Sequence, residues 1–167
     1  MASDRVQAMA WPVLVHSVRT ALVAVISLLV ARLFRLPASY WAPITTLVIT
    51  QSSLGAAFAV STQRFIGTLL GALVGGVAAA WFGSNVLVFG VCLFLLGLLC
   101  AVTQAGLAAY RFGSIAVAIV ILVPRSSSAW VVAFNRFAEV SIGIGVALLL
   151  AVVWPEREAI PSSQASK

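Results

Sequence analysis

The chain has 167 residues, of which 62% are hydrophobic and only 8% are charged, and its mean hydropathy is +1.13. A soluble domain carries roughly 25% charged residues, and a water-soluble core of this length could not bury so much apolar surface. The net charge of +6 comes from scattered basic residues without any run, which argues against a nucleic-acid partner and favours an integral membrane protein of one domain.

Hydropathy and helix breakers divide the chain into six predicted membrane helices. A short N-terminal segment, residues 1–12, precedes them. The helices are expected at 13–34, from Trp41 to about Val60, from just after Arg64 to Phe82, at 86–103, at 105–123 and at 136–154.

The fold class follows from the needs of a backbone in lipid. Its polar groups must be bonded internally, so the spans are helices or strands of a closed barrel, and the lack of strict alternation excludes the barrel. We therefore expect an all-α, polytopic membrane protein with a six-helix domain over residues 13–155. The polar tail, residues 156–167, is expected to be disordered.

An even number of spans places both termini on one side of the membrane. With the N-terminus inside, six basic residues lie on the inner side and four on the outer side. Because cytoplasmic segments carry an excess of Lys and Arg, this count favours two cytoplasmic termini.

Two segments of the sequence resemble each other. RFIGTLLGALVGGVAAAWFG, from Arg64, aligns without a gap with RFAEVSIGIGVALLLAVVWP, from Arg136, at an offset of 72 residues. The alignment predicts that spans one to three repeat as spans four to six, inverted in the membrane, which is a mark of transporters. The alternative is a chance match between two apolar helices.

Small residues recur every four positions in both segments. This spacing places them on one helix face, where they let membrane helices approach closely. We expect helix packing at Gly67, Gly71, Gly75 and Gly143.

The second span carries polar residues that need a partner. Thr46 and Thr50 share one helix face, and Gln51 lies beside it. They either line a path for a polar substrate or bond to helix carbonyls and neighbouring helices.

Charged residues near the apolar segments are the strongest functional signal. Glu139 lies three residues after Arg136, on the same helix face, so the two side chains can pair. Arg64 and Arg111 have no acidic residue nearby in the sequence. An arginine that lacks a carboxylate in a water-filled interior is suited to receive one from a ligand, although Arg64 and Arg136 could also snorkel from helix starts.

Other chemistries find no support in the sequence. The single histidine, His16, excludes a multi-histidine metal cluster, and no glycine-rich phosphate loop is present. No nucleophile–base set or acid pair is evident, so we expect no enzyme activity, no metal and no cofactor.

Several residues of the chain form a pattern that resembles that of a known family. An aromatic-Trp-Ala start is followed by a polar patch, Arg-x-x-Gly-Thr-x-x-Gly-Ala and a late Arg-x-x-Glu-x-x-x-Gly before a terminal proline. This pattern resembles the fusaric acid resistance and aromatic acid exporter group, and it looks like the membrane domain of plant aluminium-activated malate transporters. The matching residues are Tyr40, Trp41, Ala42, Arg64, Gly67, Thr68, Gly71, Ala72, Arg136, Glu139, Gly143 and Pro155.

The resemblance implies a six-helix unit of the inner membrane that exports small organic anions, often aromatic carboxylates. Because larger members appear to use two such units, it implies a homodimer or a higher homo-oligomer here. Two alternatives stay open: a passive anion channel, and a non-transporting membrane subunit that stabilises another protein.

Overall fold

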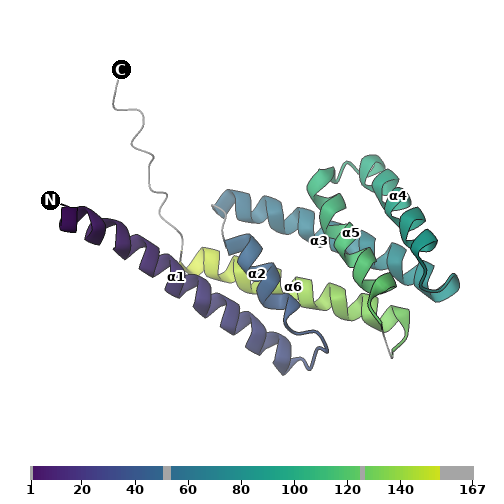
Figure 1. The fold of residues 1–167 in the computed structure, drawn as a ribbon, viewed down its shortest axis with the longest axis horizontal. Coiled ribbons are helices and arrows are strands. Elements are labelled where there is room, and N and C mark those ends of the chain that lie inside the picture. The colour runs from purple at the N-terminus through teal and green to yellow at the C-terminus, as the bar shows by residue number, and fades with distance from the viewer. Residues whose placement is uncertain (1, 51–53, 125–126, 155–167) are drawn as a thin grey trace, which may run out of the picture.

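The computed structural model describes residues 2–50, 54–124 and 127–154, with side chains from residue 13 onward except that of Leu54. Within these ranges the chain forms six α-helices and no strand (Figure 1). The all-α prediction is therefore confirmed, whereas the tail predicted at 156–167 lies outside the described residues. The helices are α1 (Ala2–Leu33), α2 (Trp41–Thr50), α3 (Leu54–Trp81), α4 (Val86–Val102), α5 (Gly106–Leu122) and α6 (Ala129–Val153).

Predicted and observed ends agree closely for α4 and α5 but not for the end of α2 and the starts of α3 and α6. The second helix was expected to continue to about Val60, yet α2 ends at Thr50, and α3 begins at Leu54, well before Arg64. Likewise, α6 begins at Ala129 rather than at Arg136. An arginine lowers the local hydropathy without interrupting backbone hydrogen bonds, so the prediction mistook a charge for a helix end.

This correction changes where the two arginines lie. Arg64 is about 15 Å from the start of α3 and Arg136 about 10 Å from the start of α6, at 1.5 Å per residue. The prediction that both occupy helix N-termini, where a cation opposes the helix dipole, is wrong. Both side chains instead lie within the helical bundle.

The first helix also differs from the prediction. It begins at Ala2, so residues 2–12 continue the helix rather than forming a separate segment. The apolar stretch within it, Val13–Leu33, is the part that hydropathy detects, because polar residues can be helical without being hydrophobic.

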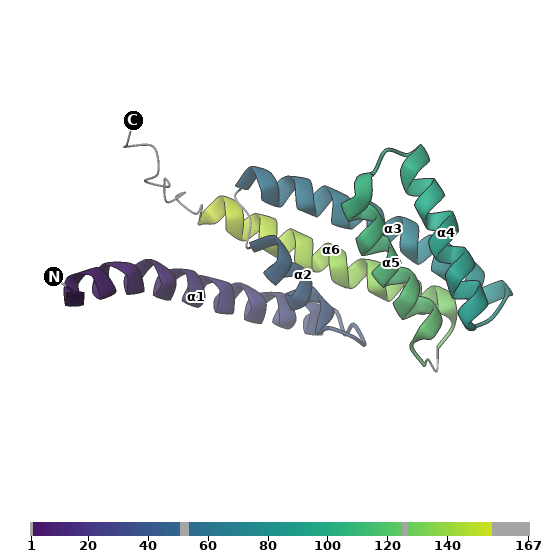
Figure 2. The same cartoon turned by 45° about the horizontal axis from the view of Figure 1, so that its top comes forward.

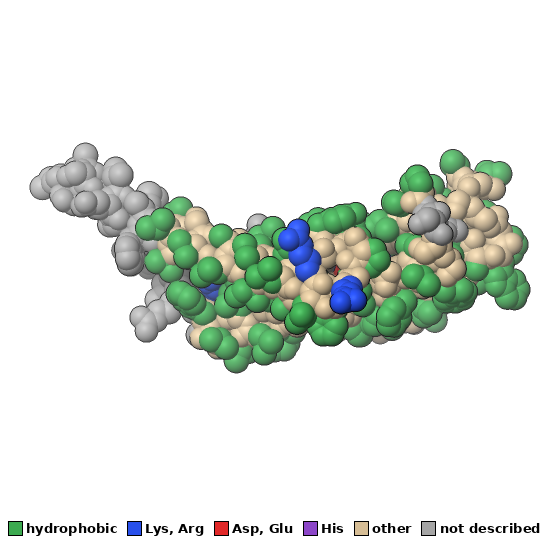
Figure 3. Space-filling view, turned by 90° about the horizontal axis from the view of Figure 1, so that it is seen from below, with side chains coloured by type: hydrophobic (Ala, Val, Ile, Leu, Met, Phe, Trp, Pro, Cys, Tyr) green, Lys and Arg blue, Asp and Glu red, His purple; other side chains and the backbone are tan. Residues whose placement is uncertain are grey.

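Among the described residues, three helical stretches are long and apolar enough to cross a membrane: Val13–Leu33, Gly55–Trp81 and Ala129–Val153. The helices α2, α4 and α5 are apolar but shorter. Hydrophobic side chains are spread along the whole length of the face shown in Figure 3, and large ones are exposed on every helix. An apolar surface of this extent is that of a membrane protein.

The arrangement of the helices has an internal symmetry (Figures 1 and 2). At its centre α3 and α6 pack against each other, and they run in opposite directions: Gly76 meets Trp130 and Ala133, whereas the ring of Phe65 lies 5.0 Å from that of Phe137. Around this pair, α5 packs on α3 as α2 packs on α6. Similarly, α4 contacts α5 and α3 as α1 contacts α2 and α6.

The same correspondence holds for individual residues. A Cβ at Gly71 would lie 2.7 Å from the Cα of Gly113 on α5, and a Cβ at Gly143 would lie 2.6 Å from the carbonyl oxygen of Ala42, at the start of α2. Gly71 and Gly143 differ by 72 positions, and Gly113 and Ala42 by 71. This packing agrees with the expected three-plus-three inverted repeat, whose two halves differ by one residue in register.

The glycine ladder of α3 faces α5. A Cβ at Gly67 would collide with the backbone of Ala109, and one at Gly75 would lie 3.3 Å from the Cα of Val117. Because these positions carry no side chain, the backbones of α3 and α5 come together over several turns.

The turn after α1 brings the residues that follow it to the candidate functional site. Arg35 has φ 53, and the N–H of Leu36 donates to the carbonyl of Ala31 at 3.3 Å. This left-handed residue ends α1 and reverses the chain. Pro37 and Ala38 follow and lie over α6.

Candidate functional site

Arg136 is the centre of the candidate site. Its side chain is 3% exposed, and its guanidinium carbon lies 3.8 Å above the ring centroid of Trp41 on α2. Within the described part of the chain, its Nε and Nη1 atoms have no hydrogen-bond partner. A buried guanidinium normally uses its donors, so this arrangement leaves strong hydrogen-bonding capacity unused.

Glu139 neutralises Arg136 without bonding to it. Its Oε2 lies 3.9 Å from Nη1 of Arg136, close enough for an ion pair but too far for a hydrogen bond. Its Oε1 instead accepts a 3.1 Å hydrogen bond from the backbone N–H of Ala38. The carboxylate is thus fixed to the α1–α2 turn and leaves the donors of Arg136 open.

A pocket of about 290 Å³ opens beside this pair. Such a volume is at the small end of the range for small-molecule sites. Its wall comes from the α1–α2 turn, from α5 and its following turn, and from α6. The polar and aromatic lining residues are Tyr40, Trp41, Ser127, Asn135, Arg136 and Glu139.

Arg64 forms a second, more enclosed centre next to the first. Its side chain is 5% exposed, its Nη2 donates to Oγ1 of Thr45 at 3.1 Å, and its guanidinium carbon lies 4.7 Å from the ring centroid of Phe112. Its Nε has no hydrogen-bond partner among the residues that the structure describes. In the described part of the chain, no carboxylate lies within ion-pair distance of Arg64.

The two centres are related by the repeat and share one helix. Phe112 and Trp41 differ by 71 positions, so each arginine stacks on the equivalent aromatic ring of the other half. Trp41 and Thr45 are one turn apart on α2, and the hydroxyl of Thr45 donates to the carbonyl of Trp41 at 3.0 Å. Arg136 stacks on Trp41 and Arg64 bonds to Thr45, so the two guanidinium groups lie beside neighbouring turns of α2. They form one buried cluster, defined as Arg64, Arg136 and Glu139.

The other residues expected to act on a substrate lie elsewhere. Thr46 donates to the hydroxyl of Ser27 and lies within bonding distance of the carbonyls of Ala42 and Gly143. Thr50 donates to the carbonyl of Thr46 at 2.7 Å. The hydroxyl of Thr46 is therefore used between helices, and that of Thr50 within α2 itself.

Arg111 and Gln51 are the remaining residues that the sequence predicts to act on a substrate. Arg111 lies on the exposed side of α5, although Phe112 next to it faces the cluster. Gln51 lies outside the described residues. The sequence reasoning missed Thr45, Phe112 and the aromatic role of Trp41. The repeat could have indicated Phe112, because its equivalent, Trp41, precedes a conspicuous polar run.

Replacing Thr46 by valine tests whether this hydroxyl belongs to the packing. We expect a loss of about 0.6–2 kcal/mol in stability, the range measured for hydrogen bonds between membrane helices, because Ser27 loses its partner. Anion affinity should remain that of the wild type. Thermal unfolding in detergent and equilibrium binding measure the two effects, and weaker binding without lower stability would instead place Thr46 at the ligand.

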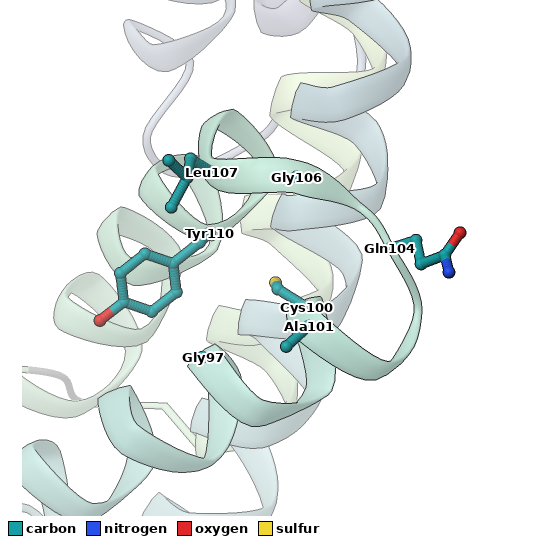
Figure 4. Close-up of a pocket in the computed structure, with 7 residues that line it drawn as sticks. All are labelled: Gly97, Cys100, Ala101, Gln104, Gly106, Leu107 and Tyr110. Carbon is teal, nitrogen blue, oxygen red and sulfur yellow. The ribbon is translucent and has the colours of Figure 1, made fainter.

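A second cavity lies between α4 and α5, and its lining residues differ in chemistry from those around Arg136. It measures about 410 Å³ and is lined by Gly97, Cys100, Leu107 and Tyr110 together with the connecting turn (Figure 4). Gln104, in that turn, points away from the ring of Tyr110 (Figure 4). No arginine or carboxylate lines this cavity, so it does not suit a charged ligand.

Comparisons with known proteins agree with this description. The sequence pattern of the family described as "Fusaric acid resistance protein-like" matches residues 22–150. The chain is 28% identical over 150 residues to the inner membrane protein YeeA of Escherichia coli (strain K12). The match covers 88% of this chain but only 42% of YeeA. No solved structure matches the chain.

Proposed function

Because the chain belongs to the fusaric acid resistance protein-like family, we propose that it transports small organic anions, aromatic carboxylates in particular, outward across the inner membrane. It acts as a transporter and not as an enzyme. The observation that carries the proposal is Arg136, whose buried guanidinium lines an open pocket with two donor atoms unpaired. A desolvated carboxylate requires such a countercharge.

The surroundings of Arg136 favour an aromatic acid over a purely aliphatic one. A carboxylate that binds Nε or Nη1 forms a charge-assisted hydrogen bond with Arg136. Tyr40 and Trp41, whose ring centroids are 5.7 Å apart, also line the pocket and offer stacking surfaces for the ring of the ligand.

The proposed topology has six crossings with both termini in the cytoplasm. In support, α1 begins and α6 ends toward the same end of the molecule (Figures 1 and 2). The pocket is lined from the α1–α2 and α5–α6 connections, which lie at the other end. It therefore opens to the outside in this topology, and Arg64 lies on the route from the cytoplasm. The relative's inner-membrane name supports the choice of membrane.

Uptake of radiolabelled benzoate into proteoliposomes tests the proposal. We expect flux with the wild type and a loss of about tenfold to hundredfold for Arg136→Gln, because hydrogen bonds to charged groups are worth about 1.5–3 kcal/mol. Arg111→Gln is the matched control: it removes an exposed arginine and should retain wild-type flux.

The same vesicles separate the alternatives. Currents far above carrier turnover would indicate a passive channel that uses the same site. Absence of anion flux from the wild type at verified incorporation would overturn the proposal and favour a non-transporting subunit.

We further propose a homodimer or a higher homo-oligomer as the working form. Exposed apolar surface on every helix leaves ample area for contact between copies within the membrane. A detergent-corrected mass of one chain, from light scattering on a preparation that transports benzoate, would contradict this assembly.

A further inference from the structure

We propose that Glu139 determines how much negative charge the ligand of the buried cluster can carry, so that the site accepts a monoanion and rejects a dianion. This inference rests on the proposed anion function of the same site. It assigns to Glu139 a role in specificity, as a fixed charge that acts beside the ligand.

The formal charge of the cluster is small. Arg64 and Arg136 contribute two positive charges, and Glu139 contributes one negative charge, with side chains 5%, 3% and 1% exposed. The sum is one positive charge. One ligand carboxylate brings the cluster to neutrality, whereas a ligand with two carboxylates leaves one buried negative charge. Burial makes this difference costly, because charges out of water are tolerated only when paired.

Glu139 remains in place when a ligand enters. Its Oε1 is bonded to the backbone of Ala38, and its Oε2 is 3.9 Å from Arg136 rather than in a hydrogen bond with it. A ligand carboxylate that reaches the buried Nε or Nη1 of Arg136, neither of which has a partner among the described residues, need not displace Glu139. The negative charge of Glu139 therefore counts against every further negative charge of the ligand.

The other charged groups nearby do not alter this balance. Arg32 and Arg35, near the pocket, are exposed, and their charges are screened by solvent. Arg19 is buried on α1 but lies eight residues before Ser27, the contact of Thr46, which is about 12 Å along the helix. Tyr40 is the remaining titratable group among the residues that line the pocket.

The excess of positive charge in the cluster originates at a position where the two halves of the internal repeat differ. Position 67 is the equivalent of position 139, and Gly67 is pressed against the backbone of Ala109. A carboxylate at that position would have no space. Only Arg136 therefore has an acidic residue three positions after it, and the surplus positive charge follows from the close packing of α3 on α5.

Phthalate and its monomethyl ester form a matched pair of ligands for the test. They share a ring and differ by one charge at about pH 7.5, where carboxylates are ionised. Equilibrium binding to the purified full chain in detergent gives the ratio of their affinities. The wild type should bind the monoester more tightly. Glu139→Gln raises the cluster charge to two and should shift the ratio toward phthalate by about tenfold or more. Glu139→Asp, which keeps the charge, should retain the wild-type order.

The wild type offers a second readout that needs no variant. Phthalate should bind with uptake of one proton, and the monoester with none, as measured by pH change in weakly buffered solution. An unchanged ratio in Glu139→Gln, or phthalate binding to the wild type more tightly than the monoester without proton uptake, would overturn the inference and leave the transport proposal intact. A wild type that binds neither ligand nor benzoate would overturn both.

Discussion

Replacing Gly71 by alanine should prevent the chain from folding into a monodisperse protein. The added Cβ would lie 2.7 Å from the Cα and 2.8 Å from the carbonyl carbon of Gly113. These are backbone atoms, which cannot rotate away as a side chain can. The helices α3 and α5 would have to separate along their whole contact, at a cost of at least about 3 kcal/mol, the upper end of the range for overpacked cores. Gly71→Leu should be more severe.

Gly145→Ala is the matched control in another membrane helix. Gly145 lies on the exposed side of α6 and has nothing within 4 Å of its ideal Cβ. The change should be neutral or stabilise the protein by about 0.5–1 kcal/mol, because alanine is the better helix former. Yield after size exclusion and thermal unfolding in detergent measure both variants. Equal yields for Gly71→Ala and Gly145→Ala would mean that α3 and α5 are not in backbone contact in the membrane.

The contrast between these glycines shows what the sequence can predict about packing. The four-residue spacing of Gly67, Gly71 and Gly75 indicates a shared face, and the structure has all three on the side of α5. Spacing alone does not identify the helix that covers the face. The contact partner, Gly113, follows from the three-dimensional arrangement and from the repeat that relates it to Ala42.

Helix boundaries were predictable only where a backbone signal coincided with a drop in hydropathy. Asn85 caps α4, accepting from the N–H groups of Leu87 and Val88, and the predicted start of this helix is correct. Arg64 gives a drop in hydropathy without any cap, so a helix that begins at Leu54 was predicted to begin ten residues too late. Hydropathy measures transfer to lipid, whereas helix ends depend on backbone bonding.

Only the part of the site that depends on local helix geometry was predictable from the sequence. Glu139 and Arg136 are three residues apart, so their proximity follows from helix geometry. The N–H of Ala38 lies 101 residues away from Glu139 in sequence, and no local pattern links them. Thr45 and Thr46 are neighbours with different partners, Arg64 and Ser27, and only the rotation of α2 in the bundle distinguishes them.

The second large effect should appear at Arg64. Arg64→Gln removes one positive charge from the buried cluster, so that a bound monoanion leaves an excess negative charge. Two unit charges about 6 Å apart, roughly one helical turn, interact by about 3 kcal/mol at an effective dielectric constant of about 20. We therefore expect the flux of benzoate to fall by roughly a hundredfold at limiting substrate concentration. Arg64→Lys should keep part of the flux, because lysine retains the charge but not the planar fork.

Thermal stability should not fall with flux in Arg64→Gln. This difference distinguishes an arginine that acts on the ligand from one that stabilises the fold. Arg64 is buried, its Nε is unpaired, and no carboxylate of the described residues is within ion-pair distance, so its charge is a cost to the folded state. Replacing it by neutral glutamine should leave thermal stability equal or raise it, because Thr45 keeps its own hydrogen bond to Trp41. Flux in proteoliposomes at matched incorporation, together with unfolding in detergent, gives both readings. Wild-type flux in Arg64→Gln would mean that the arginine only orients the chain in the membrane, and a loss of both flux and stability would mean that it supports the packing of α2 and α3.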